Sequence, residues 1–486
     1  MKKYIIVLML SIFSGSVFAQ GAQDALRYSQ IYYMGTARSM AMGGAFGALG
    51  ADLSVAATNP AGLGLYRVNE YSLSTYFTNT FAHSEYNNTA SDGYKMNVGI
   101  SNFGYVSAIR LAPKNSGGWQ YVQFAIGMNK TNDFNSYTDM QGNNSQNSRI
   151  DSYLYNAYGI NYTDLKNQDP YYLYPAWSVY LLDTIPGYTN EYYSPVPQGG
   201  VYQRDQIYKS GGVNEWFLSA AANFENKFFI GATLGFTSLH YKQDSYYSET
   251  FPTDSTTQLS LWGVDQSLET TGSGVNLKLG FLYQPVNWLR IGAAIHTPTW
   301  YYSMTDTWQT KTYADLPGWY TGTAQSDVGT YSYKLTTPTV LLGDVGIIIG
   351  KRGSISAEFE NVNYSTMKLS ASDYSFTNEN DNIKKYYRSV NNIRLGTEWR
   401  FGLMDVRAGY AYYGSPYANN YNDGKREILS GGLGFNIGHY NLGLAAVHSL
   451  QKQKYYFYGN QYVPVNPSQN TFNKTSLVVS LSYRFY

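Results

Sequence analysis

The final segment of the chain, Ser476 to Tyr486, most constrains what the protein can fold into. Every second residue of this segment is apolar, and the apolar residues are Leu477, Val479, Leu481, Tyr483 and Phe485, which alternate with Ser480, Ser482 and Arg484. Because side chains on a β-strand point alternately to its two faces, the segment predicts a strand with one apolar face. Such a strand suits the wall of a transmembrane barrel, although a strand of a soluble sandwich has the same pattern.

The beginning of the chain indicates export. Lys2 and Lys3 precede an apolar stretch at 4–13, and Val17-Phe18-Ala19 has the pattern of a cleavage site. Residues 1–19 therefore read as a signal peptide, so that the mature protein begins at Gln20. Beyond it, no stretch approaches the roughly 20 apolar residues that a membrane helix needs. Strands rather than helices would have to meet lipid.

The composition favours a barrel. Charged residues make up 14% of the chain and aromatic residues 17%, and there are 51 Tyr and 47 Gly. This mixture suits aromatic girdles, strands and tight turns better than a Leu-rich helical core. A net charge of +1 gives no reason to propose nucleic acid as a partner. The chain has no Cys, which fits an exported protein that does not depend on disulfides.

Alternation of period two recurs along residues 69–486 and predicts an all-β, 14-stranded antiparallel transmembrane barrel. The expected strands lie at 69–82, 94–111, 118–132, 213–225, 226–243, 274–285, 287–302, 332–349, 351–368, 387–401, 403–416, 425–437, 438–456 and 471–486. The expected short connections are 112–117, 225–227, 284–288, 350–353, 401–403 and 438–439; the expected long ones are 83–93, 133–212, 244–273, 303–331, 369–386, 417–424 and 457–470. Short turns on one rim and long loops on the other are typical of outer-membrane barrels, with the short side periplasmic.

Residues 20–68 differ in character from the strands that follow. Within them, 35–65 is rich in Gly and Ala, has few charges and shows no alternation. A compact segment of small residues, interrupted by turns, could pack inside the lumen of a barrel, because small residues allow a close approach to the wall.

Two runs in this segment resemble the N-terminal hatch of the FadL/TodX outer-membrane transport proteins. They are Ser39-Met40-Ala41-Met42-Gly43-Gly44-Ala45 and Ala57-Thr58-Asn59-Pro60-Ala61-Gly62-Leu63, with Asp52 between them. The resemblance covers about 30 residues and includes the Asn-Pro-Ala tripeptide of that family. It implies Asn59, Pro60, Ala61, Gly43 and Gly44 as hatch or gating residues. The alternative is that the tripeptide only forms a turn that helps the hatch to pack.

The family resemblance also implies a function. Its members have fourteen strands and a plugged lumen, and they pass long-chain fatty acids or aromatic compounds through the outer membrane without an energy source. The ligand is thought to land on apolar loops, enter an internal pocket and leave by a lateral opening near the third strand after the hatch shifts. No Pro or obvious bulge marks that opening at 118–132, where Gly127 is the one candidate.

Two sets of residues are candidates for contact with a ligand. The first lies in the longest loop, 133–212, where Tyr174, Trp177 and Leu181 belong to an unusually apolar stretch. An exposed aromatic patch suits the landing of an apolar ligand, but these side chains could equally fold the loop into a lid, and Tyr-rich loops also bind sugars or proteins.

The second set lies on expected wall strands. Arg394, Arg400 and His296 could hold a carboxylate inside the lumen, since Arg pairs with carboxylates in bidentate fashion. The stronger alternative is that such charges pair across strands and hold the hatch to the wall.

Nothing in the sequence points to catalysis. The five His residues show no metal-ligand spacing, and Gly44–Gly50 lacks the Lys-Ser/Thr of a phosphate loop. We therefore expect a non-enzymatic protein without cofactor or metal in the outer membrane of a Gram-negative bacterium. Its expected partners are outer-membrane lipids and a hydrophobic ligand that it takes up passively. The alternative is a barrel of this kind serving as a structural or docking subunit of a surface complex; an adhesin or barrel enzyme is a third class.

Overall fold

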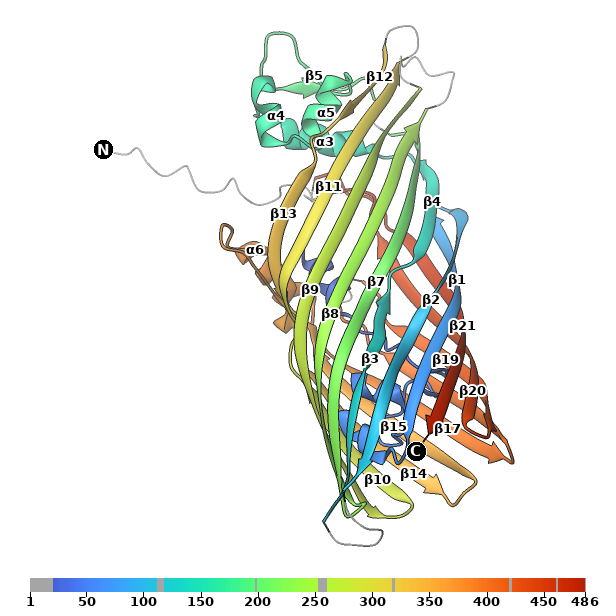
Figure 1. Ribbon diagram of the computed structural model, residues 1–486. Helices are drawn as coiled ribbons and strands as arrows, with labels where there is room; N and C mark the ends of the chain where they lie inside the picture. Colours follow the sequence, from blue (N-terminus) through green and yellow to red (C-terminus); the bar gives the residue numbers. More distant parts are fainter. Residues whose placement is uncertain are drawn as a thin grey trace.

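Fourteen antiparallel wall positions form a closed barrel in the computed structural model (Figure 1). The structure describes residues 21–111, 118–196, 199–251, 260–316, 320–418, 422–459 and 462–485. The expected signal peptide, the turn at 112–117 and Tyr486 lie outside these residues. The barrel closes because β1 (Asn69–Tyr86) pairs with both β2 (Thr89–Arg110) and β21 (Ser468–Phe485).

The remaining wall strands follow in chain order. They are β3 (Trp119–Asp133), β4 (Ser136–Asn144), β7 (Val201–Phe224), β8 (Phe228–Thr250), β9 (Leu261–Val286), β10 (Leu289–His296), β11 (Trp300–Leu316), β12 (Tyr320–Gln325), β13 (Gly329–Thr336), β14 (Val340–Ile349), β15 (Gly353–Asn363), β16 (Lys368–Ser370), β17 (Ser389–Phe401), β18 (Met404–Tyr413), β19 (Arg426–Ile437) and β20 (Tyr440–Tyr455). All the segments expected to be strands contribute to the wall, so the predicted strand number is confirmed.

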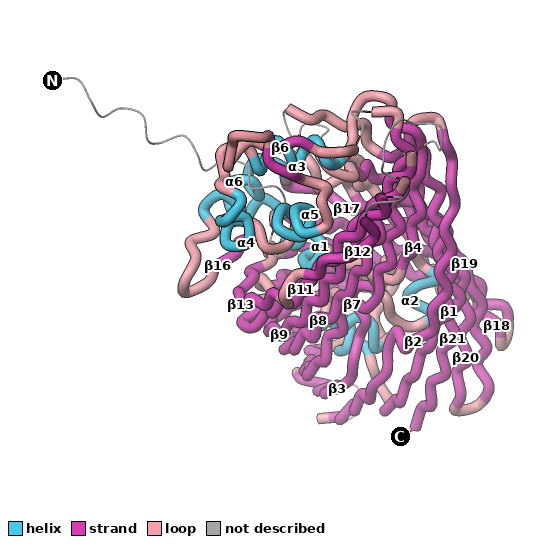
Figure 2. Tube along the Cα trace, turned by 90° about the horizontal axis from the view of Figure 1, so that it is seen from above, coloured by secondary structure: helices cyan, strands magenta, loops and turns pink. Residues whose placement is uncertain are grey.

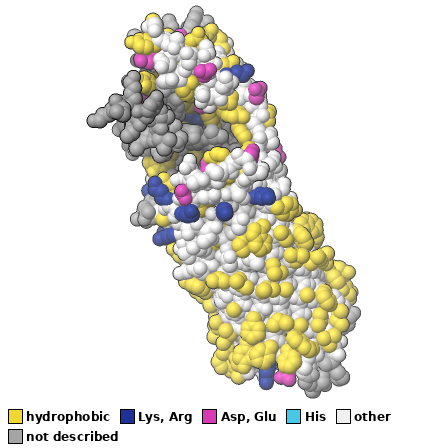
Figure 3. All heavy atoms as spheres, turned by 90° about the vertical axis from the view of Figure 1, so that its left-hand side faces the viewer, with side chains coloured by type: hydrophobic (Ala, Val, Ile, Leu, Met, Phe, Trp, Pro, Cys, Tyr) yellow, Lys and Arg dark blue, Asp and Glu magenta, His cyan; other side chains and the backbone are white. Residues whose placement is uncertain are grey.

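The two faces of the wall strands differ as the alternation predicts. On β21, Leu477 and Leu481 are 53% and 50% exposed, whereas Ser480 between them is 7% exposed. On β17, Leu395 points outward while Arg394 is buried in the lumen. Figure 3 shows the outward apolar side chains gathered over the lower part of one face, below a row of Lys and Arg. This apolar band is the surface that a barrel presents to lipid.

The short turns that fall within the described residues lie where the sequence predicts them. The turn between β7 and β8 has positive φ at Glu225 and Asn226, and Gly350, Gly402 and Gly438 have positive φ in three further turns. Left-handed backbone is what tight hairpins require, and Gly adopts it without steric cost.

At the opposite rim the strands are longer than the sequence predicts. The expected loop at 83–93 is wrong, because β1 and β2 continue to a two-residue turn at Asn87 and Asn88, both with positive φ. The expected loop at 244–273 is likewise mostly strand, since β8 extends to Thr250 and β9 starts at Leu261. Above the apolar band both faces of a strand carry polar residues, so apolar alternation ends before the strand does.

Three wall positions are interrupted at one level. Thr297–Thr299 separates β10 from β11, Thr337–Thr339 separates β13 from β14, and the 3₁₀ helix η4 (Tyr364–Thr366) separates β15 from β16. The strands expected to be continuous at 287–302, 332–349 and 351–368 are therefore broken. Pro298 and Pro338 explain two of the breaks, because Pro has no N–H to donate to a neighbouring strand.

The helices belong to three groups. The first lies inside the barrel (Figures 1 and 2) and consists of α1 (Ala22–Ser29), α2 (Ala37–Ala41) and the 3₁₀ helices η1 (Leu53–Ala57) and η2 (Pro60–Leu65). The second covers the long-strand rim and consists of α3 (Arg149–Ala157), η3 (Tyr162–Asp164), α4 (Leu165–Gln168) and α5 (Leu173–Ser178), with the small hairpin β5 (Asp183–Thr184) and β6 (Tyr192–Tyr193). The third is α6 (Thr377–Tyr386), after β16. Among the described residues, no helix is both long and apolar enough to cross a membrane.

Candidate functional site

The Asn-Pro-Ala tripeptide contacts the barrel wall directly. Asn59 Nδ2 donates to Asp344 Oδ2 on β14 at 2.7 Å, and Asn59 Oδ1 accepts from the backbone N–H of Ala61 at 3.2 Å. The second bond caps the N-terminus of η2, where Pro60 occupies a position that needs no N–H donor. The side chain of Asn59 therefore both caps η2 and joins it to the barrel wall.

Glycines in the wall make room for the tripeptide. A Cβ atom at Gly280 would lie 2.2 Å from Asn59 Oδ1, and a Cβ atom at Gly231 would lie 2.4 Å from the Pro60 carbonyl. Gly292 is also close to Asn59, with 2.9 Å between a Cβ atom there and Asn59 Nδ2. Three neighbouring strands, β8, β9 and β10, thus present backbone rather than side chains to this part of the hatch.

Gly43 and Gly44 turn the chain beside β18. Both have positive φ, 64° and 80°, and a Cβ atom at Gly43 would lie 3.0 Å from the backbone of Tyr410. The wall strand β18 again has a glycine at the point of contact, since a Cβ atom at Gly409 would lie only 2.2 Å from Gly43 N. We call residues 21–66, which make these contacts inside the barrel, the plug segment.

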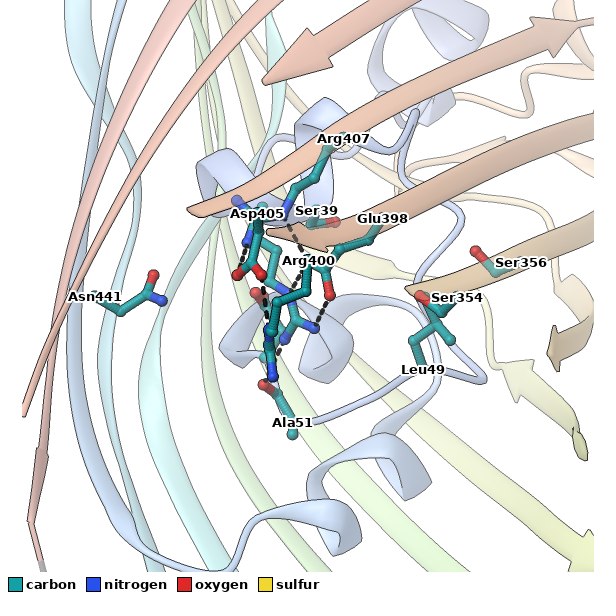
Figure 4. Close-up of polar contacts among 12 residues, drawn as sticks. Ser39, Leu49, Ala51, Ser354, Ser356, Glu398, Arg400, Asp405, Arg407 and Asn441 are labelled. Carbon is teal, nitrogen blue, oxygen red and sulfur yellow. Dashed lines mark hydrogen bonds and ion pairs between the residues drawn. The ribbon is translucent and has the colours of Figure 1, made fainter. Parts of the chain in front are cut away.

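A chain of alternating charges joins the plug segment to β17 and β18 (Figure 4). Arg38 donates to both oxygens of Glu398, at 2.8 and 2.7 Å, and Arg407 Nε donates to the same carboxylate at 2.6 Å. Arg407 and Arg400 then share Asp405, at 3.2 and 2.9 Å. Arg400 is therefore already paired with a carboxylate of the wall, and its side chain is half exposed near the short-turn rim.

Arg394 lies in a second buried cluster. Its guanidinium pairs with Glu358 and with Glu360, the latter at 2.8 Å, and it lies 4.9 Å from the ring of Tyr33 in the plug segment. All three charged side chains are almost fully buried. Glu358 also accepts from the backbone N–H of Gly47 at 3.2 Å. The cluster joins plug and wall, which is the structural role that the sequence analysis favoured for such charges.

His296 also contacts the plug segment. Its Nε2 donates to the carbonyl of Thr58 at 2.6 Å, and the residue is 3% exposed. Because a carbonyl only accepts, this bond places the ring proton on Nε2. His296 thus holds the residue immediately before Asn59.

We call residues 149–193, from α3 to β6, the cap. Tyr174, Trp177 and Leu181 pack within it. Leu181 is fully buried, and Trp177 stacks on Tyr162 at 5.5 Å and meets Tyr192 edge to face at 6.0 Å. The cap touches the wall through aromatic pairs, including Tyr180 with Tyr320 at 5.0 Å. This arrangement is that of a folded lid, although part of the Trp177 surface stays open.

The cap is joined to the barrel by a buried carboxylate. Glu249 on β8 is fully buried and accepts from Tyr247 Oη at 2.6 Å, Trp262 Nε1 at 2.8 Å and the backbone N–H of Arg149 at 2.9 Å. Ser148, the N-cap of α3, also donates to it. Within the cap, burial raises the pKa of the Asp169 carboxyl, whose Oδ1 accepts from the backbone N–H of Tyr172 at 2.8 Å.

The wall divides at the third strand. β2 pairs with β3 only from Arg110 to Asn102, which lies opposite Asn129. A bulge at Ser101 follows, and β3 has a register shift between Lys130 and Asn132. Beyond that point β4 pairs with β7 and packs across the lumen side of β1 and β2, where Ser91 Oγ donates to the Asp139 carbonyl at 2.6 Å. We call the point where β2 and β3 part the fork.

The plug segment occupies the lumen side of the fork. Tyr32 N donates to the Thr131 carbonyl at 2.8 Å, and Met34 N donates to the Lys130 carbonyl at 3.1 Å. On the other arm, Ser101 Oγ donates to the Gly35 carbonyl at 2.8 Å. The extended residues 32–35 thus take the place beside β3 that β2 has left.

No family model and no curated protein matches the sequence, but solved structures match it over most of its length. A FadL homologue from Pseudomonas aeruginosa has a TM-score of 0.58 at 13% identity, covering 94% of this chain and 100% of the other. The toluene transporter TodX of Pseudomonas putida has a TM-score of 0.53 at 13% identity, covering 94% and 99%. The toluene transporter TbuX of Ralstonia pickettii has a TM-score of 0.51 at 16% identity, covering 93% and 98%.

The chain has the FadL-type fold. A barrel with an N-terminal segment in its lumen is what the resemblance of residues 39–63 implies. The sequence showed no obvious bulge at 118–132, but β3 has a register shift between Lys130 and Asn132. The fold alone assigns no ligand.

Sequence reasoning missed several residues that build this FadL-type site. Gly231, Gly280 and Gly409 were not singled out, although each receives the plug segment. Their signal is a Gly on the lumen face of an expected strand, where a polar side chain would otherwise stand. Ser101 and Lys130 were missed because a bulge inside a polar stretch leaves no break in the apolar pattern.

Proposed function

We propose that this protein is an outer-membrane channel for the passive uptake of hydrophobic small molecules, either long-chain fatty acids or aromatic compounds. The FadL-type fold supports the proposal, since TodX and TbuX are described as toluene transporters. The outward apolar band supports a place in a bilayer. The expected membrane is the outer membrane, to which the predicted signal peptide and C-terminal strand direct an exported barrel.

The observation that carries the proposal is that one segment both fills the bore and covers the fork. Residues 32–35 bond to both arms of the fork, and residues 59–61 of the same segment sit on the glycines of β8 to β10. A movement of the plug segment would therefore open the bore and the fork together. A hydrophobic molecule leaving by the fork enters lipid without crossing water, which is the route that its low solubility favours.

Few hydrogen bonds hold the plug segment at the fork. Three of them join residues 32–35 to the two arms, and each contributes about 1 kcal/mol net. The rings of Tyr32 and Tyr33 also lie on Arg426 and Arg394, so moving the segment costs more than these three bonds alone. Passive uptake requires only that thermal motion populates the open state, without an energy source. The cap, with Trp177 and Tyr174, would receive the ligand at the outer rim.

Uptake by reconstituted vesicles tests the proposal. Purified full-length protein is inserted into lipid vesicles, and the entry of radiolabelled palmitate and toluene is followed against protein-free vesicles of the same composition. We expect faster entry of at least one probe to the same final level, because a passive channel changes the rate and not the equilibrium. Entry of both at the protein-free rate would refute it.

A further inference from the structure

One long strand edge of the barrel has no strand beside it. Above the fork, β2 pairs with β1 on one side from Thr89 to Ile100, and the described residues provide no strand on its other side. β4 cannot serve, because it packs behind β2 on the lumen side, where a Cβ atom at Gly93 would lie 2.6 Å from the Tyr137 carbonyl. β2 thus has an open edge about twelve residues long.

The hydrogen-bonding groups of this edge follow from the hairpin geometry. A two-residue turn at Asn87 and Asn88 makes Tyr86 and Thr89 a hydrogen-bonded pair. In an antiparallel ladder such pairs alternate, so every second residue of β2 directs its N–H and C=O away from β1. These residues are the even-numbered ones, Ala90, Asp92, Tyr94, Met96, Val98 and Ile100.

The open edge reaches into the apolar band. Val98 pairs with Phe77, which in turn pairs with Leu477, and both of these partners face outward. Met96 and Val98 are 68% and 74% exposed, compared with 53% for Leu477 on a strand flanked on both sides. Within hydrocarbon the backbone N–H and C=O groups of an open sheet edge have no hydrogen-bond partners, because lipid acyl chains offer none. The edge therefore needs an occupant that supplies backbone.

We propose that the open edge of β2 is a docking site for an extended segment of a different protein, which adds to the barrel as a strand. Alternating apolar side chains on that segment would continue the stripe formed by Tyr94, Met96 and Val98. On its other face the segment would carry an acidic residue. Lys95 lies on this lumen-facing side of β2, where it donates to the Lys209 carbonyl at 3.0 Å, and an acidic residue beside it would add to the attraction of Asp133 and Asp244.

A second copy of this chain does not fit the edge. Antiparallel pairing of two β2 edges requires a two-fold axis in the membrane plane, which would invert one copy relative to the bilayer. Parallel pairing about an axis along the strands would place the apolar stripes of the two copies on opposite faces of the shared sheet. Neither arrangement keeps both apolar stripes in lipid.

Docking at this edge would also regulate the fork. The inference rests in this part on the proposed function, because a strand added to β2 would stand in front of the lateral route. A bound segment would then slow uptake without touching the plug segment. Binding itself does not depend on whether the protein transports anything.

A defined peptide tests the docking site. The probe is a nine-residue peptide in which Val alternates with Thr and with one central Glu; its control has the same composition in an order that breaks the alternation. With the full-length protein in detergent micelles, we expect the probe to slow hydrogen exchange of the Met96 and Val98 amides and to leave those of Lys95 and Asn97 unchanged. Equal protection by the control peptide, or no protection by the probe, would overturn the proposal.

Matched substitutions separate backbone pairing from simple apolar contact. Met96→Pro removes an N–H that β1 does not use, whereas Met96→Ala keeps that N–H and removes the side chain. We expect the Pro variant to bind the probe at least about tenfold more weakly than the Ala variant. Equal affinities for the two variants would contradict strand addition.

A crosslinking experiment in native outer membranes identifies the class of occupant. A photoreactive residue at Val98 is expected to give an adduct with a different chain, which Met96→Pro abolishes and Met96→Ala keeps. An adduct of twice the mass of this chain would identify a second copy and overturn the proposal. Vesicle uptake by Met96→Pro without peptide should equal that of the unsubstituted protein. Failure of the proposed transport would appear as no uptake by either protein, whereas failure of the proposed docking would appear as no peptide binding and no adduct.

Discussion

Asn59 in the plug segment and Asp344 on β14 are joined by a hydrogen bond of 2.7 Å, across 285 residues of sequence. The same amide lies 3.3 Å from the Phe281 carbonyl on β9 and also caps η2. The tripeptide that resembles the family hatch therefore acts here as an anchor between plug and wall. A gating role for Asn59 would operate through this anchor rather than through contact with a ligand.

Gly280→Ala should loosen the plug segment and leave the barrel intact. A Cβ atom there would lie 2.2 Å from Asn59 Oδ1, an overlap that costs about 1–3 kcal/mol to relieve. Limited proteolysis of residues 21–66 measures the effect, and the heat-dependent migration of the barrel in detergent gels serves as the folding check. Gly343→Ala is the control, because a Cβ atom at Gly343 has no neighbour within 4 Å. Equal protease resistance in the two variants would contradict the anchor.

The pair formed by Arg38 and Glu398 should be energetically coupled. A double-mutant cycle with Arg38→Met and Glu398→Gln is expected to give a coupling of about 1.5–3 kcal/mol, typical of hydrogen bonds between partly buried charges. The exposed pair of Lys384 and Asp381 on α6 should give less than about 0.5 kcal/mol. Unfolding in urea provides the free energies. A coupling near zero for the first pair would show that the charges in Figure 4 do not hold the plug segment.

Arg394→Gln should destabilise the protein without changing its choice of ligand. Glu358 and Glu360 would lose their buried counter-charge, a loss that typically costs about 3–5 kcal/mol. Any fall in vesicle uptake should therefore affect palmitate and toluene alike. A fall confined to palmitate would instead indicate that Arg394 binds the carboxylate of the ligand.

Trp177→Ala should make the cap more sensitive to protease. The substitution removes the contacts with Tyr162 and Tyr192, each of which contributes about 0.5–1.5 kcal/mol beyond the buried area. Cleavage within residues 149–178 measures the loss, and Tyr188→Ala, which changes an exposed cap residue, is the comparison. An unchanged cap with slower uptake from dilute ligand would favour a landing site on Trp177.

Much of the barrel could be predicted from the sequence because lipid imposes a strict alternation on its wall. Leu477 and Leu395 had to face outward, and the short turns at Gly402 and Gly438 followed from the spacing. Outside the apolar band lipid no longer imposes alternation, so the sequence predicted a loop where β1 and β2 extend to the turn at Asn87. The pair Asn87-Asn88 was the missed signal, since Asn tolerates the positive φ of a tight hairpin.

The candidate site was less predictable, because it depends on register and on missing side chains. Arg394 and Glu358 lie on neighbouring expected strands, yet only the pairing of β15 with β17 brings them together. Gly280 matters because its missing side chain leaves room for Asn59, and a local sequence pattern does not reveal which glycine faces the plug segment. The fork at Ser101 and Lys130 arises where an inserted residue ends the pairing of β2 with β3, within a polar stretch that resembles its surroundings.

If the plug segment must move for a ligand to pass, uptake should stop when the segment is fixed to the wall. Ala37 on α2 and Gly443 on β20 are the sites for an engineered disulfide, since the chain has no native Cys. A Cβ atom at Gly443 would lie 3.2 Å from that of Ala37, so the two residues need to separate by only a few tenths of an ångström to reach the roughly 3.5–4.5 Å across a disulfide. Ser219→Cys with Thr233→Cys, which joins two wall strands, is the control. We expect the oxidised Ala37→Cys/Gly443→Cys protein to admit palmitate and toluene at the protein-free rate and reduction to restore uptake. Equal uptake before and after reduction would contradict this expectation.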